Sequence, residues 1–341
     1  MLKKGVIEPS NSSWSSPICL VKKKDQVSWR FCIDYRRVNS LCSPSGYPLQ
    51  KIDDCLASLE GAKWLSTVDC HSGYWQVSCD EEDREKTAFS THKGLFQFRV
   101  MPMGLNSAAQ TFQKLMEKVL GNLQWRHCLC YLDDIIIFGN NFEQALENHK
   151  LVFECLRAAN LKLKPSKCTL FQKEVIFLGH VVSENGIKCD PTKIESVKDW
   201  PSPTNVSEIK SFLGFAGYYR KFISEFFTIA SPLIKLTRKN QSFKWSDECE
   251  ESFNKLKERL ISAPILSFPK DEGLFILDTD ASLNGVGAVL SQIQDEKEKV
   301  ISYASRTLSK SQRNYCVTKR ELLAVVTFVR QFRLTCGDES F

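Results

Sequence analysis

The stretch His127-Cys-Leu-Cys-Tyr-Leu-Asp133-Asp134-Ile-Ile-Ile-Phe138 places two adjacent acids between two apolar runs. Each run has the composition of a buried strand, so the stretch predicts a tight hairpin with both acids at or beside its turn. The turn lacks the Asn-Gly or Asp-Gly pair that favours such hairpins. Two carboxylates about 4 Å apart repel by roughly 4 kcal/mol at an effective dielectric near 20. A divalent cation such as Mg²⁺ removes this cost; the alternative is a solvent-exposed acidic turn.

A third acid, Asp69, ends the apolar run of residues 64–68 and is followed by a turn that contains Gly73. An acid at the end of a strand is a common position in active sites, although an Asp that only caps the strand fits these residues equally well. Together with Asp133 it would complete a two-metal site for phosphoryl transfer. The sequence contains no Gly-x-x-x-x-Gly-Lys loop, which disfavours a P-loop nucleotidase.

The hairpin belongs to a region of about 180 residues in which short β-rich runs alternate with helical patterns, which predicts an α+β fold class. Residues 189–260 are mainly helical in pattern, and we expect Pro201, Pro203 and Pro232 each to begin or end a helix. After Pro269 a new β pattern opens and a helix follows it, which predicts a further domain.

Composition sets the limits on the class of protein. With 341 residues, 43% of them hydrophobic, the chain is long enough for two or three domains with their own cores, which excludes a disordered or fibrous protein. The first 50 residues hold eight Lys and Arg against three Asp and Glu, which indicates either a phosphate-binding lobe or a solvated face. No apolar stretch approaches the roughly 20 residues of a membrane span, and no secretory signal opens the chain, so we expect an intracellular protein.

Four motifs occur in an order that identifies a family. They are VKKKDQVSWRFCIDYRRVN, STVDCHSGYWQV, YLDD and FLGFAGYYRKFISEF. Over residues 5–332 the chain resembles the polymerase region of gypsy-type long-terminal-repeat retrotransposon Pol polyproteins, a reverse transcriptase with a truncated ribonuclease H. The resemblance implies a right-hand polymerase with fingers and palm over 1–184, incomplete at the N-terminus. It implies a thumb and connection over 185–270 and a ribonuclease H-like domain over 271–341, truncated at the C-terminus.

The resemblance also implies roles for the acids and the residues around them. Asp69, Asp133 and Asp134 would be the catalytic acids that hold two Mg²⁺ ions, with Asp69 and Asp133 the direct ligands. Tyr74 would lie beneath the incoming sugar and exclude a 2′-hydroxyl; without the family it would be a core or stacking residue. Lys167 would protonate the leaving pyrophosphate, although most surface lysines have no such role.

Further implied contacts bind the nucleotide and the nucleic acid. Lys23 and Arg30 would grip the triphosphate from a fingers hairpin. Met103 and Gly104 belong to the loop that stacks against the new base pair, where the family usually has Phe in place of Met103 and Pro in place of Ala109. The remaining implied nucleic-acid contacts are Arg36 with the template backbone, which could instead pair with Asp34, and Gly179 and His180 in the primer grip.

In the last domain, Asp280 and Glu321 match two of the four acids that hold the metal ions of ribonuclease H. The family supplies two further Asp beyond Phe341, and Asp338 does not replace them. We therefore expect ribonuclease H activity to be weak or absent. Cleavage of RNA in a hybrid by the purified chain, lost in Asp280→Asn, would contradict this.

The expected function is RNA-directed DNA polymerisation by two-Mg²⁺ nucleotidyl transfer. The expected partners are an RNA or DNA template with its primer, deoxynucleoside triphosphates, no membrane, and other Pol segments such as protease and integrase. We expect the protein to act in a cytoplasmic retrotransposon particle, and entry into the nucleus is an alternative location. One alternative is a catalytically inactive remnant that at most binds nucleic acid. Another is a nuclease acting through Asp280 and Glu321 alone.

Overall fold

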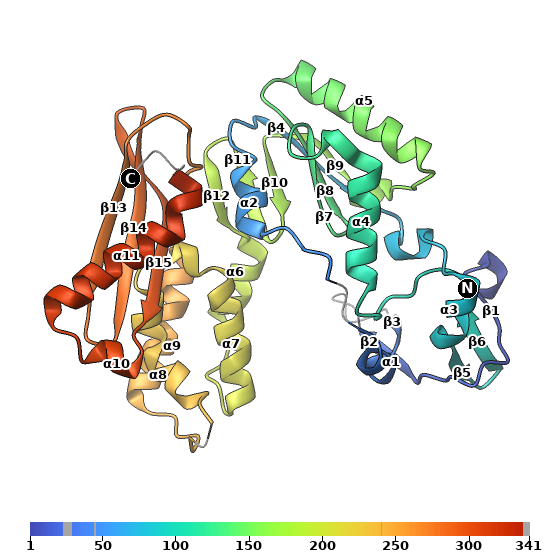
Figure 1. Ribbon diagram of the computed structural model, residues 1–341, viewed down its shortest axis with the longest axis horizontal. Coiled ribbons are helices and arrows are strands. Elements are labelled where there is room, and N and C mark those ends of the chain that lie inside the picture. The colour runs from blue at the N-terminus through green and yellow to red at the C-terminus, as the bar shows by residue number, and fades with distance from the viewer. Residues whose placement is uncertain (23–28, 44–45, 240, 337–341) are drawn as a thin grey trace. The chain divides into compact units, whose positions relative to one another are not determined.

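The computed structural model describes residues 1–22, 29–43, 46–239 and 241–336, apart from the side chains of Arg30 and Leu334. The chain divides into two compact units, one formed by Met1–Cys55 and Gly61–Val175 and the other by Leu56–Glu60 and Ile176–Phe341. Figure 1 shows helices and strands mixed within each unit, as the α+β prediction requires. Within the described ranges, no helix is both long and apolar enough to cross a membrane.

The first unit opens with small sheets. Strands β1 (Ile7–Pro9), β6 (Gly94–Phe98) and β5 (Phe89–Thr91) form one antiparallel sheet in that order, and β2 (Ile18–Lys22) pairs with β3 (Trp29–Ile33). A buried cluster that includes Ile33, Tyr35, Phe89 and Phe98 joins them. The short helices of this part are α1 (Arg36–Leu41) and α3 (Glu81–Arg84), while α2 (Ile52–Ala57) has residues assigned to both units.

The centre of the first unit is a four-stranded antiparallel sheet. Its order is β7 (Cys128–Tyr131), β8 (Asp134–Gly139), β4 (Trp64–Asp69) and β9 (Thr169–Gln172). The predicted hairpin is confirmed, because Tyr131 pairs with Asp134 and leaves Leu132 and Asp133 as a two-residue turn. Every residue of β8 after Asp134 is buried, which explains its continuous apolar sequence.

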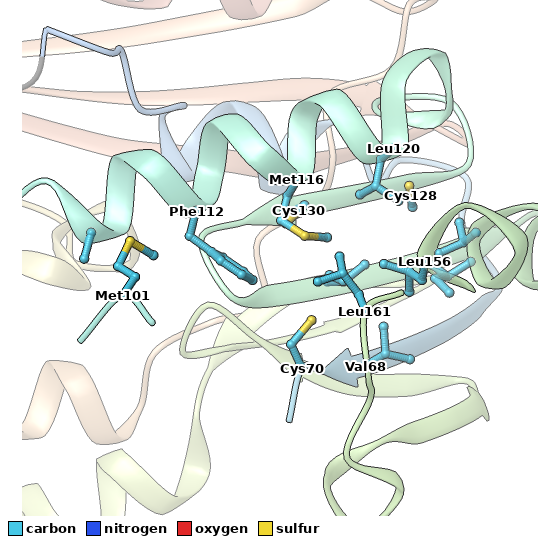
Figure 2. Packing of buried hydrophobic residues seen from close by; sticks show 14 residues of the cluster. Val68, Cys70, Met101, Phe112, Met116, Leu120, Cys128, Cys130, Leu156 and Leu161 are labelled. Atoms are coloured by element: carbon cyan, nitrogen blue, oxygen red, sulfur yellow. The ribbon is translucent and has the colours of Figure 1, made fainter. Parts of the chain in front are cut away.

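Two helices cover this sheet. Helix α4 (Ala108–Leu120) packs against β7 and against α5 (Phe142–Ala158), which in turn packs against β8. Phe112, Met116 and Leu120 recur every four residues and so share one face of α4. Figure 2 shows this face lying on a core to which β4 and β7 contribute, with Val68 and Cys128 among the labelled residues.

The second unit contains the predicted helical region. Near its start lies a sheet in the order β10 (Glu174–Phe177), β11 (His180–Ser183) and β12 (Gly186–Cys189), in which β11 and β12 pair antiparallel. The first two residues of β10 are assigned to the first unit. The helices that follow are α6 (Pro191–Lys198), α7 (Val206–Tyr218), α8 (Phe226–Leu236) and α9 (Asp247–Ile261). The side chain of Asn205 caps α7 by accepting a hydrogen bond from the amide of Glu208.

The expectation for Pro232 is wrong, because this residue lies inside α8. An interior proline costs about 3 kcal/mol. Ile229 and Leu233 on either side of it are buried, and each buried side chain contributes about 1.5 to 3 kcal/mol. The packing of α8 against α9 therefore outweighs the lost backbone hydrogen bond.

The β pattern after Pro269 and the helix after it are also confirmed. Strands β13 (Phe275–Ala281), β14 (Gly285–Gln294) and β15 (Lys297–Thr307) form an antiparallel sheet in chain order. After α10 (Lys310–Arg313), the long helix α11 (Val317–Cys336) packs against β13 and β14. Leu290, Ile301 and Phe328 lie in the core that this packing creates.

Candidate functional site

The sheet brings two acids together that lie 65 positions apart in the sequence. Asp69, the last residue of β4, is the direct cross-strand partner of Asp134, the first residue of β8. Cα atoms of opposed residues in an antiparallel pair lie about 4.5 to 5.5 Å apart. Asp133 lies in the turn directly before Asp134, and both of these acids are exposed. All three predicted acids therefore meet at one end of the central sheet.

Gln113 of α4 forms hydrogen bonds that hold the turn that carries Asp133. Leu132 adopts a left-handed backbone conformation, with φ of 57°, which residues other than glycine rarely adopt. Its amide donates a hydrogen bond of 2.6 Å to Oε1 of Gln113. Nε2 of Gln113 donates to the carbonyl of Cys130 at 3.1 Å and to Glu117 at 2.8 Å. One buried amide side chain thus fixes the conformation of the acidic turn.

The acids influence one another electrostatically. Desolvation of the carboxyl raises the pKa of Asp134, and the negative charges of Asp133 and Asp69 raise it further. Lys167, at the end of the short 3₁₀ helix η5 (Pro165–Lys167), opposes this effect. Its Nζ atom lies 2.7 Å from Oδ2 of Asp69. Lys167 is therefore a direct ion-pair partner of one of the predicted acids.

Tyr74 lies beside the acids, on the 3₁₀ helix η2 (Gly73–Gln76). Its ring and that of Phe112 pack in a T-shaped arrangement with the centroids 5.4 Å apart. Burial raises the pKa of its hydroxyl, and the charges of Asp133 and Asp134 raise it further. A Cβ atom on Gly73 would lie 3.0 Å from the Phe112 ring, so only glycine lets this segment approach α4 so closely.

The predicted base-pair loop lies against the β2–β3 region. Gly104 has a φ of 104°, and a Cβ atom there would also lie 3.3 Å from the carbonyl oxygen of Ile33. The side chain of Asn39 donates to the Gly104 carbonyl at 2.9 Å and accepts from the amide of Asn106 at 3.0 Å. Met103 is 40% exposed, so its side chain is available for contact.

The predicted triphosphate and template contacts are only partly described. Lys23 and the side chain of Arg30 lie outside the described residues. Arg36 forms an ion pair with Asp34 at 2.5 Å, which was the alternative for this residue. This arginine lowers the pKa of Asp34 to about 2, mainly through its side-chain hydrogen bond.

The predicted primer-grip residues lie in the second unit: Gly179 is in the turn between β10 and β11, and His180 is the first residue of β11. Gly179 has a φ of 66°, and a Cβ atom there would lie 2.6 Å from Nζ of Lys193. Two consecutive tyrosines hold the turn. The hydroxyl of Tyr218 donates to the Leu178 carbonyl at 2.5 Å, and that of Tyr219 donates to the Gly179 carbonyl at 2.7 Å. His180 is buried, with its ring stacked on Phe222.

Asp280 lies on β13, opposite Gly287 of β14. Glu321 lies on α11, which packs against β13. Asp280 is exposed and Glu321 is half-buried. The fold therefore places the two predicted ribonuclease H acids on neighbouring elements.

The donor chemistry of the first unit suits a hard divalent cation. Mg²⁺ is commonly held by one or two carboxylates together with substrate phosphates. Asp69 and Asp134 are opposed on paired strands. Desolvation raises the pKa of Asp134, and so do the negative charges of Asp133 and Asp69, which a cation would neutralise. In the described part of the chain, no three His, Cys, Asp or Glu side chains are grouped closely enough to hold a metal ion. These acids thus fit a site that substrate oxygens help to complete.

Comparisons with known proteins identify two families along the chain. Residues 21–182 match the family described as reverse transcriptase (RNA-dependent DNA polymerase), and residues 245–341 match the RNase H-like domain found in reverse transcriptase. Residues 21–182 therefore form a reverse-transcriptase domain of this chain. Its homologues are retrotransposon Pol polyproteins.

Two relatives illustrate the match within this family. The chain is 42% identical over 338 residues to the Pol polyprotein of transposon 297 from Drosophila melanogaster, covering 98% of this chain and 32% of that protein. It is 38% identical to the Pol polyprotein of transposon gypsy from the same organism, covering 96% and 33%. The chain therefore spans about a third of the length of these relatives.

Solved reverse transcriptases share the fold. The foamy viral protease–reverse transcriptase in complex with double-stranded DNA matches with a TM-score of 0.87 and 24% identity, over 98% of this chain and 59% of that one. The same enzyme in complex with an RNA/DNA hybrid matches with a TM-score of 0.84, over 98% and 45%. The expected right-hand polymerase fold is confirmed.

The sequence interpretation missed two kinds of positioning residue. Gln113 is a polar residue between Phe112 and Met116 on the buried side of α4, and a polar interruption of an apolar helix face was the available signal. Tyr218 and Tyr219 were part of a quoted motif, but nothing local to the sequence indicated that their hydroxyls reach back 40 residues to a turn.

Proposed function

We propose that this chain is the RNA-directed DNA polymerase of a long-terminal-repeat retrotransposon. The observation that carries the proposal is the cross-strand pairing of Asp69 with Asp134 beside the Asp133 turn. It is supported by the family match of residues 21–182. A template with its primer, deoxynucleoside triphosphates and the cytoplasmic particle of the element are part of the same proposal.

In this proposal Asp69, Asp133 and Asp134 hold two Mg²⁺ ions, with Asp69 and Asp133 as direct ligands. The bound ions would activate the primer 3′-hydroxyl and neutralise charge on the leaving pyrophosphate. The acids themselves orient the attacking oxygen and the α-phosphate. Lys167, already paired with Asp69, supplies a positive charge and a proton donor beside the reacting groups.

The surrounding residues select and place the substrates. The ring of Tyr74, fixed against Phe112, lies beneath the sugar and excludes a 2′-hydroxyl. Lys23 and Arg30 bind the triphosphate, while Met103 and Gly104 contact the new base pair. The nucleic acid is held by Arg36, Gly179 and His180, mainly through its backbone.

We assign fingers and palm to residues 1–184, thumb and connection to 185–270, and the ribonuclease H-like domain to 271–341. Asp280 and Glu321 are the residues of that last domain that would contribute to a metal site. Their neighbouring positions on β13 and α11 support this assignment.

Primer extension on an RNA template with Mg²⁺ and deoxynucleotides tests the proposal. The wild-type chain should extend the primer, and Asp133→Asn/Asp134→Asn should abolish extension. Glu81→Gln/Glu82→Gln is the matched control, because it also neutralises two adjacent exposed acids, on α3. A folded wild-type chain that binds primer–template but never extends it would instead favour the inactive, nucleic-acid-binding alternative.

A further inference from the structure

Two cysteines face each other across the β2–β3 hairpin. Cys19 of β2 is the direct register partner of Cys32 of β3. Opposed residues in an antiparallel pair project to the same face of the hairpin. Both are free thiols; Cys19 is exposed and Cys32 is half-buried. The hairpin therefore presents a pair of thiols that a small molecule can reach.

The ladder geometry permits a bond between them. Asp34 donates to the carbonyl of Pro17 at 2.9 Å, so these opposed residues form a hydrogen-bonded pair. Because the two kinds of pair alternate along the ladder, Cys19 and Cys32 also form a hydrogen-bonded pair, with Cα atoms about 5.5 Å apart. Disulfides usually join Cα atoms about 4.4 to 6.8 Å apart.

The bond would be strained and easily reduced. Opposed Cβ atoms lie about 4.5 to 5.5 Å apart, whereas a disulfide needs about 3.5 to 4.5 Å. The two strands must therefore twist closer together, which a two-stranded ribbon allows more readily than a wide sheet. Strained or exposed disulfides have the more oxidising potentials and are the labile ones.

The opposite face of the hairpin anchors it. Ile33 is buried, and Ile18 and Phe31 pack against the same core. These residues alternate with Cys19 and Cys32 along the strands, so the thiols lie on the face turned away from that core. A change in twist there can act on the pair of Lys22 and Trp29, the last described residues of the two strands, without removing the anchor.

A cation lies near the exposed thiol. Arg36 is held chiefly by its hydrogen bond to Asp34, which raises its pKa, and the charge of ionised Cys19 raises that pKa slightly further. Arg36 therefore lies within electrostatic range of the outer face of the two strands.

We propose that Cys19 and Cys32 form a reversible cross-strand disulfide when the chain meets a small-molecule disulfide oxidant such as oxidised glutathione. The Cys19 thiolate attacks one sulfur of the oxidant and expels one glutathione thiolate. The Cys32 thiolate then attacks the Cys19 sulfur and expels the second. Two protein thiols are oxidised, one glutathione disulfide is reduced to two glutathiones, and the two protons of the protein thiols pass to solvent or to the released thiolates.

Disulfide mapping of the wild-type chain tests this directly. The reduced chain, kept dilute, is treated with oxidised glutathione, alkylated, digested and analysed by mass spectrometry. We expect one intramolecular cross-link between the peptides that carry Cys19 and Cys32, a loss of two alkylatable thiols, and full recovery with dithiothreitol. Finding Cys19 and Cys32 separately alkylated or separately glutathionylated would overturn the proposal.

Serine variants test whether the cross-link joins Cys19 to Cys32. Cys19→Ser and Cys32→Ser should each abolish it. Cys42→Ser/Cys316→Ser should keep it, because Cys42 and Cys316 are equally classed as exposed but lie outside strands. A cross-link that persists in Cys19→Ser, or that disappears in the control, would count against the pair.

A consequence for activity rests on the proposed function. If this hairpin helps to bind the triphosphate, oxidation should raise the KM for deoxynucleotides in wild-type chain and not in Cys19→Ser/Cys32→Ser. A mapped cross-link without a change in KM would overturn this coupling. Failure of the fully reduced chain to extend a primer would count against the proposed function and leave the disulfide standing.

Discussion

At the scale of single residues, the site depends on side chains that position the acids and take no part in the proposed reaction themselves. The turn between β7 and β8 holds Leu132 in a left-handed conformation, with a backbone cost of roughly 1 to 2 kcal/mol for a residue with a Cβ atom. The hydrogen bond from its amide to Gln113 offsets part of this cost. The direction in which Asp133 points therefore depends on a side chain from a helix.

Replacing Gln113 should weaken both stability and activity. In Gln113→Leu the Leu132 amide loses its partner, which costs about 1 to 3 kcal/mol. Urea unfolding should show this loss, and primer extension should fall further than stability alone explains. Lys114→Ala, an exposed change on the same helix, is the control and should alter neither. Unchanged extension by folded Gln113→Leu would show that the turn keeps its conformation without the amide.

Tyr74 should control the choice between deoxynucleotides and ribonucleotides. If its ring excludes a 2′-hydroxyl, Tyr74→Val should raise kcat/KM for ribonucleotides relative to deoxynucleotides, because the barrier beneath the sugar is removed. Tyr74→Phe keeps the ring edge against Phe112 and should keep the selectivity. The measurement is the ratio of kcat/KM for the two nucleotide classes. Equal ratios in all three proteins would remove Tyr74 from this role.

At the scale of elements, α5 carries a buried histidine, His149, that makes the stability of the first unit depend on pH. His149 is 3% exposed and stacks on Phe171 with ring centroids 4.3 Å apart. Its Nδ1 lies 2.6 Å from the Ala145 carbonyl, and among the described residues Nε2 has no hydrogen-bond partner. Burial lowers the pKa of His149, and the hydrogen bond to Ala145 opposes that shift.

Acid should therefore destabilise this element. As pH falls below about 6.5, the unfolded chain binds a proton on this histidine before the folded chain does. The contribution of His149 to the free energy of unfolding should fall by at most about 1.4 kcal/mol per pH unit, and stop falling below the folded-state pKa. His149→Phe should flatten this slope in urea titrations from pH 7 to pH 5, whereas His92→Gln, at an exposed position, should not. A slope unchanged by His149→Phe would contradict the assignment.

At the scale of the whole molecule, the chain builds separate cores. One core lies between α4, α5 and the central sheet of the first unit, and another lies between α11 and the β13–β15 sheet of the second. Each core contains a fully buried phenylalanine, Phe112 in the first and Phe328 in the second. Damage to one core should therefore act on its own unit first.

Phe328→Ala should unfold the second unit selectively. Truncation of a buried Phe costs about 3 to 5 kcal/mol. Hydrogen exchange should show lost protection in β14 and β15, with protection in β7 and β8 retained. Leu322→Ala, at a residue of the same helix that is 62% exposed, is the control and should change neither region. Equal loss of protection in both units would show that they unfold together.

Much of the fold was predictable because its signals are local. The apolar runs on either side of Asp133 and Asp134 predicted a hairpin, and the helical pattern after residue 189 predicted the helices. Pro232 was misjudged because its effect depends on burial against α9, which is not a local property.

The strands, the acidic turn and, through four ordered motifs, the family follow from the amino-acid sequence alone. The pairing of Asp134 with Asp69, the support of the turn by Gln113 and the opposition of Cys19 and Cys32 are visible only in the folded chain. Strand register and helix packing join residues far apart in the chain, and the free energy of those contacts comes from burial of whole faces rather than from any local pattern.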